Sequence, residues 1–324
     1  MRGDMADVPE SLQGEAEAFD RRMEERVSNG LIPDLRRCQR CDWFYNNPWR
    51  HPSYVEMVFG GYLNFALAHV PPAGSHVLEV GSGLGHMSLE LARHGYHVTG
   101  LDLSGYSIDV ADYYRLDNSY EDGFGSLRYR LQDILNWDFS QQFDAACFFL
   151  TLHHFSPPSE VLDIVFEHLR PDGIIVVVEP ARDWFSRLNA TVIALIRLLL
   201  SSTEHWYEKL QLPSNELDLD RFISDIELEY REARDPTEEQ QSPHDNSAYA
   251  TDMIEALDAR FTRLGFETTF AFVPRMVGGV RTGNEEQTLN IAGFLHLFDN
   301  YCVRRGLLQP GVFMYAGRKD LSPR

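Results

Sequence analysis

The sequence has few cysteines and few basic residues for its length. Only 4 of its 324 residues are cysteine, too few for a disulfide framework in a chain of this size. Lys and Arg number 29 against 49 Asp and Glu, which gives a formal net charge of -20. Because most of such a surface repels phosphate, nucleic acid and anionic membrane are poor candidates for a partner.

The sequence also lacks an apolar run long enough to cross a bilayer. The most apolar stretch, Leu188–Leu200, is too short and contains Arg197. Residues 1–30 mix acidic and basic side chains and show no basic segment followed by an apolar one, the pattern of a secretory signal. We therefore expect a cytoplasmic protein with no membrane partner. The sequence gives no indication of its oligomeric state.

A structural metal site is not expected either. Cys38 and Cys41 form a CxxC pair with His51 downstream, but a structural zinc ion usually needs four ligands. Cys147 and Cys302 lie far away in apolar contexts. Zinc binding remains the alternative to four ordinary thiols.

Composition and periodicity divide the chain into four segments. Residues 1–70 combine helically spaced charges with a dense aromatic stretch and predict a helical N-terminal cap. Residues 71–180 alternate short apolar strands with amphipathic helices, the pattern of a mostly parallel sheet covered on both faces. Residues 181–264 predict a helical insertion after the fifth strand, and residues 265–324 predict two last strands with another helix between them.

Seven strands are predicted in an α/β chain. Gly265 is expected to end a helix over residues 248–264. The predicted strands are residues 76–80, 97–102, 127–131, 143–150, 173–179, 267–273 and 312–318.

A glycine-rich loop follows the first predicted strand. Residues 79–85 read E-V-G-S-G-L-G and open a predicted helix. Glycines allow a tight turn and close approach of a ligand, while the amides of a helix start can bind an anionic group. Asp102 ends the second strand 21 residues after Gly81, where an acid can accept hydrogen bonds from ribose hydroxyls. The loop and the acid together predict an adenosine-containing ligand.

The third glycine of the loop distinguishes two kinds of adenosine cofactor. The dinucleotide fingerprint GxGxxG places it one residue later, where this chain has His86. A dinucleotide must seat a pyrophosphate there, whereas S-adenosylmethionine presents only a methionine carboxylate. The loop therefore favours S-adenosylmethionine. The alternative is a loop that merely turns a corner, with Asp102 an incidental surface acid.

These residues resemble the class I S-adenosylmethionine-dependent methyltransferases, in particular the bacterial small-molecule methyltransferases that include ubiquinone-pathway enzymes. The resemblance covers Val77–Glu179 and, more loosely, the last two strands. It implies a Rossmann-like, seven-stranded, mostly parallel sheet with helices on both faces. It also implies S-adenosylmethionine as cofactor and a small-molecule methyl acceptor as partner.

The resemblance implies roles for individual residues. The glycine loop would bind the methionine part of the cofactor, Asp102 the ribose, and Asp133 with Ile134 the adenine. Tyr62 lies where relatives place a polar side chain near the methionine carboxylate. The implied cofactor-binding residues are Tyr62, Glu79, Gly81, Ser82, Gly83, Gly85, Asp102, Leu103, Asp133, Ile134 and Phe149.

Two histidines follow the fourth predicted strand, at the edge of the sheet where open α/β folds bind their ligands. An acceptor that carries a proton must lose it during methyl transfer, and histidine is the side chain suited to accept it near neutral pH. We expect His154, and second His153, to act as the base, or both to be structural. Glu179 is a third catalytic candidate, or part of a strand-end salt bridge. Because the stretch around Thr151 lacks carboxylates, we expect no catalytic metal.

The insertion contains the aromatics Trp184, Phe185, Trp206 and Tyr207 beside the apolar run, which favours an enclosed apolar or aromatic acceptor. The leading hypothesis is methyl transfer to oxygen or carbon of a small metabolite. One alternative is a protein of this fold that binds the cofactor in a non-methylating or regulatory role, and another is an N-methyltransferase. The fourth strand lacks the Asn/Asp-Pro-Pro-Tyr/Phe signature of nucleic-acid methyltransferases.

Overall fold

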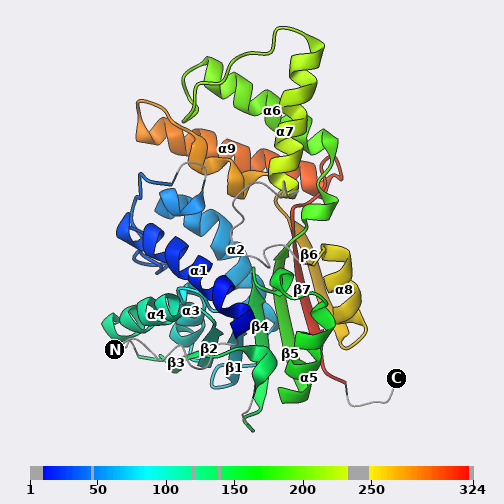
Figure 1. The fold of residues 1–324 in the computed structure, drawn as a ribbon. Coiled ribbons are helices and arrows are strands. Elements are labelled where there is room, and N and C mark those ends of the chain that lie inside the picture. The colour runs from blue at the N-terminus through cyan, green and yellow to red at the C-terminus, as the bar shows by residue number, and fades with distance from the viewer. Residues whose placement is uncertain (1–9, 45–46, 119–121, 138–139, 233–247, 321–324) are drawn as a thin grey trace.

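A computed structural model describes residues 10–44, 47–118, 122–137, 140–232 and 248–320. Within these residues one sheet has the strand order β3-β2-β1-β4-β5-β7-β6 (Figure 1). The strands are β1 (His76–Val80), β2 (His97–Asp102), β3 (Ser126–Leu131), β4 (Phe143–Phe149), β5 (Leu169–Pro180), β6 (Thr262–Thr269) and β7 (Val312–Arg318). Strands β1 to β5 pair in parallel, and β7 runs antiparallel to β5 and β6. The predicted Rossmann-like α/β fold with a mostly parallel sheet is confirmed.

Helices cover both faces of this sheet. The helices of the described residues, including those that lie beyond the sheet, are α1 (Glu10–Ser28), α2 (Pro52–His69), α3 (His86–Arg93), α4 (Gly105–Asp117), α5 (Pro158–His168), α6 (Arg187–Ser202), α7 (Glu216–Arg231), α8 (Ala250–Asp258) and α9 (Glu285–Arg304). Helices α2 and α3 pack on one face, in a cluster that includes Val77 and Val176. Helices α5 and α8 pack on the other, against Leu78 and Val177. Because the middle of β5 is buried on both faces, its sequence is an unbroken apolar run.

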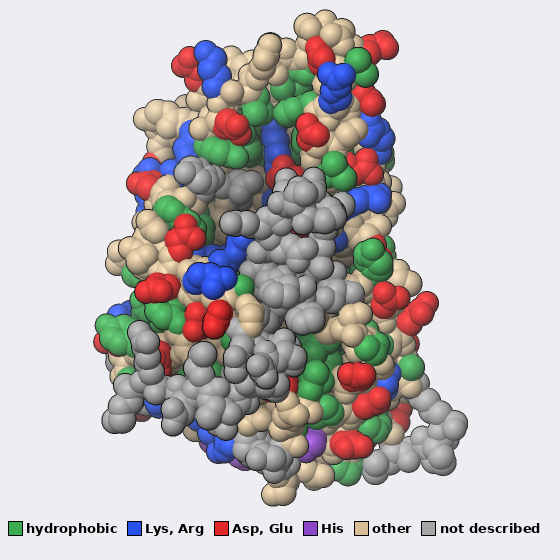
Figure 2. Space-filling view, viewed as in Figure 1, with side chains coloured by type: hydrophobic (Ala, Val, Ile, Leu, Met, Phe, Trp, Pro, Cys, Tyr) green, Lys and Arg blue, Asp and Glu red, His purple; other side chains and the backbone are tan. Residues whose placement is uncertain are grey.

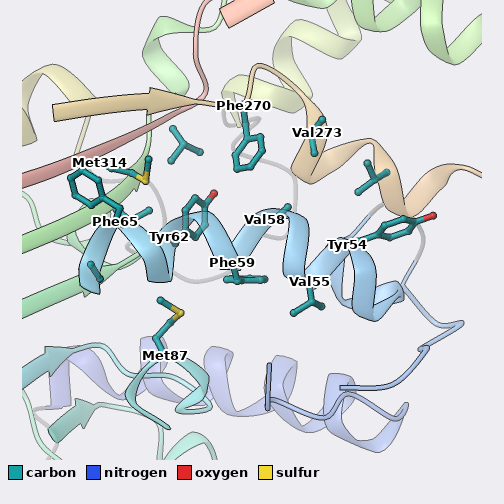
Figure 3. Close-up of a cluster of buried hydrophobic side chains, with 14 of the residues drawn as sticks. Tyr54, Val55, Val58, Phe59, Tyr62, Phe65, Met87, Phe270, Val273 and Met314 are labelled. Atoms are coloured by element: carbon teal, nitrogen blue, oxygen red, sulfur yellow. The ribbon is translucent and has the colours of Figure 1, made fainter. Parts of the chain in front are cut away.

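Helix α2 connects the N-terminal part of the chain to the sheet. Figure 3 shows Phe59 on the side of α2 that faces Met87 of α3, and Tyr62 on the opposite side toward Phe270. The aromatic stretch of the sequence thus fills a core between α2 and the elements around it. Burial of such large side chains stabilises the position of α2 over the sheet.

The segment before α2 is held to the sheet domain by polar contacts. Asp20 of α1 accepts hydrogen bonds from the Ser104 hydroxyl at 2.5 Å and from the Tyr106 backbone N–H at 3.2 Å. Asp34 forms a bidentate ion pair with Arg93 of α3, at 2.7 and 2.8 Å, and both side chains are buried. These contacts place α1 against the start of α4.

Helices α6, α7 and α9 gather at one end of the molecule, at the top of Figure 1. Arg197 of α6 forms a bidentate ion pair with Glu229 of α7, at 2.6 and 2.8 Å. In the part of the chain that the structure describes, no helix combines the length and the apolar character needed to cross a membrane. Figure 2 shows acidic side chains spread over the visible face, in keeping with the negative net charge.

The largest departure from the predicted strand bounds is at β6, which is predicted over residues 267–273 and spans Thr262–Thr269. The helix predicted to reach residue 264 ends at Asp258, and β6 begins at Thr262, so Gly265 lies within a strand. The β6–β7 ladder shifts register between Arg263 and Gly265, and a Cβ at position 265 would collide with the His69 ring. The glycine therefore permits a close approach between strand and helix rather than ending a helix. Helix α8, which falls within the insertion predicted over residues 181–264, packs on the sheet instead. The rest of the division into four segments stays a proposal.

Candidate functional site

A cavity of about 610 Å³ lies at the carboxyl ends of the parallel strands. Loops after β1, β2, β3 and β4 form its floor, and residues of α1, α2 and the segment between them form much of its wall. Ten of the eleven residues expected to bind cofactor line it; Gly85 does not. Among the three catalytic candidates, only His154 lines it.

The glycine loop needs its glycines for three different reasons. Gly81, Gly83 and Gly85 all have positive φ, at +68°, +51° and +83°. A Cβ on Gly81 would collide with the Thr151 side chain, and one on Gly85 would collide with the Tyr129 hydroxyl. At Gly83 a Cβ would meet no protein atom within 4 Å. Gly85 thus serves packing beneath the loop, whereas Gly83 leaves open space at the cavity.

The loop also carries a hydroxyl that no described residue satisfies. Ser82 Oγ is buried and has no hydrogen-bond partner in the part of the chain that the structure describes. A buried polar atom of this kind normally bonds to a ligand or water. S-adenosylmethionine brings ammonium, carboxylate and hydroxyl groups to such a loop, so the residues present fit this cofactor.

Asp102 links the glycine loop to the end of β2. Its Oδ2 accepts the Gly83 N–H at 2.7 Å, and its Oδ1 accepts the Ser104 N–H at 2.8 Å. Burial raises the pKa of the Asp102 carboxyl, and the two N–H donors oppose this rise. Each carboxylate oxygen can accept a second hydrogen bond, so the side chain can still receive ribose hydroxyls.

The other two acids of the expected cofactor site are also engaged by the protein. Asp133 caps a short helical turn, accepting from the Leu135 N–H at 2.9 Å and the Asn136 side chain at 2.6 Å. Glu79 is buried and accepts a hydrogen bond from the Ser88 hydroxyl. Desolvation raises the pKa of Glu79 to about 8.

The two histidines occupy different environments. Both lie in the helical turn η4 (Leu152–His154) that follows β4, with ring centroids 4.2 Å apart. His154 faces the cavity, and the edge of its ring packs against Phe19 of α1 with centroids 5.4 Å apart. His153 is buried behind the cavity wall, with its Nδ1 2.6 Å from Glu179 Oε2.

Glu179 does not line the cavity; of the two expected roles, its pairing with His153 at the strand end corresponds to the salt bridge. It is fully buried, and its Oε1 accepts the N–H groups of Thr151 and Leu152, both at 2.6 Å. Burial raises the pKa of Glu179 to about 7. The turn that it holds includes Leu150 at a φ of +59°, a strained conformation for a leucine. The carboxylate therefore anchors the tight turn after β4.

The aromatics Trp184, Phe185, Trp206 and Tyr207 of the insertion do not line the described cavity. Phe185 stacks on Tyr230 of α7 with centroids 4.9 Å apart, and the Arg197 guanidinium lies 5.6 Å from the Trp206 ring centroid. The insertion residues that line the cavity are Arg182 and Glu232, which form an ion pair at 2.8 Å. Phe185 and Trp206 belong instead to the hydrophobic cluster that also contains Val77 and Val176 of the sheet. Periodicity cannot distinguish side chains of this kind from those that line a ligand pocket.

The apolar wall of the cavity comes instead from residues that the sequence analysis missed. Phe19 and Met23 of α1 line it together with Trp49. Phe19 and Met23 are four residues apart, a spacing typical of one face of a helix, but the many charged residues of α1 obscure this pattern in the sequence.

His86 is a further missed residue. Its ring makes edge contacts with Trp49 and Phe59, with centroids 5.3 and 5.1 Å apart, and all three residues line the cavity. Desolvation lowers the pKa of His86 to about 4, so its ring is neutral at physiological pH. Its position directly after the glycine loop is the sequence feature that could have predicted His86 as a cavity residue.

The cysteines of the CxxC pair do not converge on a metal position. The Cys41 thiol contacts the Asn29 carbonyl oxygen at 3.1 Å, and the Cys38 thiol contacts the Leu35 carbonyl oxygen at 3.5 Å. All four cysteines are free. The described residues contain no group of three or more His, Cys, Asp or Glu side chains placed to share a metal ion.

Comparisons with known proteins agree with this geometry. A family model described as a methyltransferase domain matches residues 54–228. The ubiquinone biosynthesis O-methyltransferase of Psychrobacter cryohalolentis is 32% identical over 189 residues, which is 56% of this chain and 71% of the relative. The enzyme of the same name from Xylella fastidiosa is 33% identical over 156 residues, 47% of this chain and 61% of the relative.

Two solved structures share the fold over nearly the whole chain. Geranyl diphosphate C-methyltransferase from Streptomyces coelicolor aligns with a TM-score of 0.54 and 12% identity, covering 97% of this chain and 99% of the other. The [4+2]-cyclase SpnF aligns with a TM-score of 0.53 and 15% identity, covering 98% of each chain.

The family match covers more than half of the chain, and the cavity has the donors and acceptors that the family's cofactor requires. S-adenosylmethionine is therefore the cofactor. The chain belongs to the methyltransferase-domain family, as a class I S-adenosylmethionine-dependent methyltransferase.

Proposed function

We propose that this enzyme transfers a methyl group to a hydroxyl oxygen of a small, flat, largely apolar molecule enclosed in the described cavity. The observation that carries the proposal is the position of His154, which lines the same cavity as the glycine loop and Asp102. The relatives from Psychrobacter and Xylella are named as O-methyltransferases, which supports oxygen rather than carbon or nitrogen as the acceptor atom.

The cofactor is held by the loops at the strand ends. The backbone of Gly81 and Gly83 and the hydroxyl of Ser82 bind its methionine part, Asp102 binds the ribose, and Ile134 covers the adenine. When bound, S-adenosylmethionine supplies an activated methyl group on a sulfonium. The remaining task of the protein is to place the acceptor in line with that group and to exclude water.

His154 accepts the proton that the acceptor hydroxyl loses. Its ring packs against that of Phe19, which lines the same cavity. General base catalysis by a positioned histidine typically contributes a factor of about 10² to 10⁴ in rate. His153 and Glu179 act on this residue only indirectly, because they hold the turn that carries it.

The wall formed by Phe19, Met23 and Trp49 determines the kind of acceptor. An apolar and aromatic wall with few polar groups suits a ring or other flat apolar body that carries one or two hydroxyls. The negative surface supports the absence of a nucleic-acid partner.

The proposal is tested by incubating the enzyme with methyl-deuterated S-adenosylmethionine and a panel of phenols, catechols and matched anilines, followed by mass analysis. We expect labelled product from hydroxylated probes and none from their methyl ethers. Labelled anilines alone would assign an N-methyltransferase instead. Binding of S-adenosylhomocysteine with no transfer to any probe would favour the non-methylating alternative, since SpnF, which shares this fold, is a [4+2]-cyclase.

A further inference from the structure

Arg26 lines the cavity and has no ion-pair partner among the residues that the structure describes. It lies in the last turn of α1, is half-buried and lines the cavity wall. Burial lowers the pKa of its guanidinium, the neighbouring charge of Arg22 acts in the same direction, and Glu25 opposes both. Among the described residues no carboxylate forms an ion pair with Arg26. A desolvated guanidinium without a counter-charge is unfavourable unless a ligand supplies one.

The carboxylates of the cavity do not supply that counter-charge. Glu79, Asp102 and Asp133 accept hydrogen bonds from other groups of the protein, as described above. Glu232 pairs with two other arginines, Arg182 and Arg275. Glu160, at the rim, is exposed to solvent.

The packing of α1 places this charge over the glycine loop. Met23, three residues before Arg26 and therefore on the same side of the helix, is buried in one cluster with Leu84 of the loop. Leu31, just after α1, belongs to the same cluster and also lines the cavity. The C-terminal turn of α1 is thus fixed against the loop that opens α3.

The start of α3 adds a second positive feature at the same place. Its N-cap is Gly85, which has no side chain to cap the helix, and no side-chain hydrogen bond caps it. The first residues of the helix, His86 and Met87, line the cavity. Uncapped amides at a helix start carry partial positive charge and bind carboxylates.

We infer that Arg26 binds the carboxylate of the methionine part of S-adenosylmethionine, opposite the amides at the start of α3. The inference rests on the proposed cofactor site. It gives α1 a function in cofactor recognition, because this helix supplies a positive charge, whereas Arg182 and Arg275 of the cavity are paired with Glu232. It also predicts that the enzyme discriminates against adenosyl thioethers without a carboxylate.

The test uses two ligands that differ in this group alone. S-adenosylhomocysteine carries the carboxylate, and its decarboxylated analogue, S-adenosyl-3-thiopropylamine, keeps the amine but lacks it. Isothermal titration of the wild type should show tighter binding of S-adenosylhomocysteine by about 10- to 100-fold, the scale of a hydrogen bond to a charged group. Arg26→Gln should lose this preference. Its affinity for S-adenosylhomocysteine should fall by about 10- to 100-fold, while its affinity for the analogue should stay within about twofold of the wild-type value.

Two further variants complete the design. Arg21→Gln removes a charge from the exposed side of the same helix and should change neither affinity. Arg26→Lys keeps the charge and should retain much of the preference, which separates charge recognition from a loss of folding.

Each outcome decides the inference. An equal loss of affinity for both ligands in Arg26→Gln, or an unchanged preference for S-adenosylhomocysteine, would overturn the role of Arg26 and leave the cofactor site standing. Failure of the wild type to bind S-adenosylhomocysteine would overturn the cofactor site and this inference with it. A loss confined to the binding of a carboxylated phenol would assign Arg26 to the acceptor instead.

Discussion

Nδ1 of His153 lies 2.6 Å from Oε2 of Glu179, and both side chains are buried. The end of β5 thereby holds the turn after β4 through a side chain, in addition to two backbone N–H groups. The next residue, His154, faces the cavity as a consequence. The two adjacent histidines therefore occupy different environments, and we propose that His153 positions the turn while His154 acts on the acceptor.

Glu179→Gln should weaken this turn. Glu179 contacts two backbone N–H groups with one carboxylate oxygen and His153 Nδ1 with the other, and a glutamine keeps only one accepting oxygen, which should lower the free energy of unfolding by about 1 to 3 kcal/mol. Turnover should fall while cofactor affinity changes little, because the glycine loop is untouched. Urea denaturation and calorimetry would measure both quantities. Glu167→Gln, an exposed residue on α5, is the control and should change neither.

Gly81→Ala should abolish most cofactor binding. The substitution adds a Cβ that collides with the Thr151 side chain at a backbone φ of +68°. We expect cofactor affinity to fall by at least about tenfold, with a lower melting temperature. Gly105→Ala is the matched control, since a Cβ there would meet no protein atom within 4 Å. Equal behaviour of the two variants would show that the loop conformation has been misinterpreted.

Stability should decrease with rising pH in a way that depends on Glu79. Burial raises its pKa from 4.5 to about 8, so the folded state binds this proton more tightly than the unfolded state. The resulting stabilisation is fully present below about pH 4.5 and is lost as the pH rises through 8. Glu79→Gln cannot titrate, so its free energy of unfolding should fall less between pH 5 and pH 9, by about 1 kcal/mol or more. Parallel pH profiles for both proteins would contradict this.

His154→Ala should reduce turnover on the native acceptor by about 10²- to 10⁴-fold with little change in cofactor affinity. A purely structural histidine would instead show weaker cofactor binding or lower stability without a selective loss of turnover. His76→Ala, an exposed residue at the amino end of β1, should behave like the wild type. Near-normal turnover of His154→Ala would mean that proximity alone drives the transfer.

The sheet could be predicted from the sequence because its strands carry local signals. β1, β2 and β7 have the predicted bounds, and β5 is recognisable from the run Ile174–Val178, buried on both faces. The error at Gly265 has a non-local cause, since that glycine accommodates His69 of α2.

The candidate site could be predicted only in part. The glycine loop and Asp102 form a local motif with a fixed spacing, and the structure brings them together. The sequence leaves the role of Glu179 open because a strand-end acid can face either a cavity or the neighbouring turn, and only the turn after β4 decides this. Phe19 and Arg26 escape notice because their role depends on how α1 closes over the sheet.

The measurement that most directly tests the cofactor site is calorimetric titration of the wild type and Asp102→Ala with S-adenosylhomocysteine. The account predicts one site per chain in the wild type and an affinity weakened by about 1 to 3 kcal/mol in the variant, because the alanine removes both the ribose acceptor and the partner of the Gly83 N–H. Unchanged affinity in Asp102→Ala would contradict the assignment of this cavity to the cofactor.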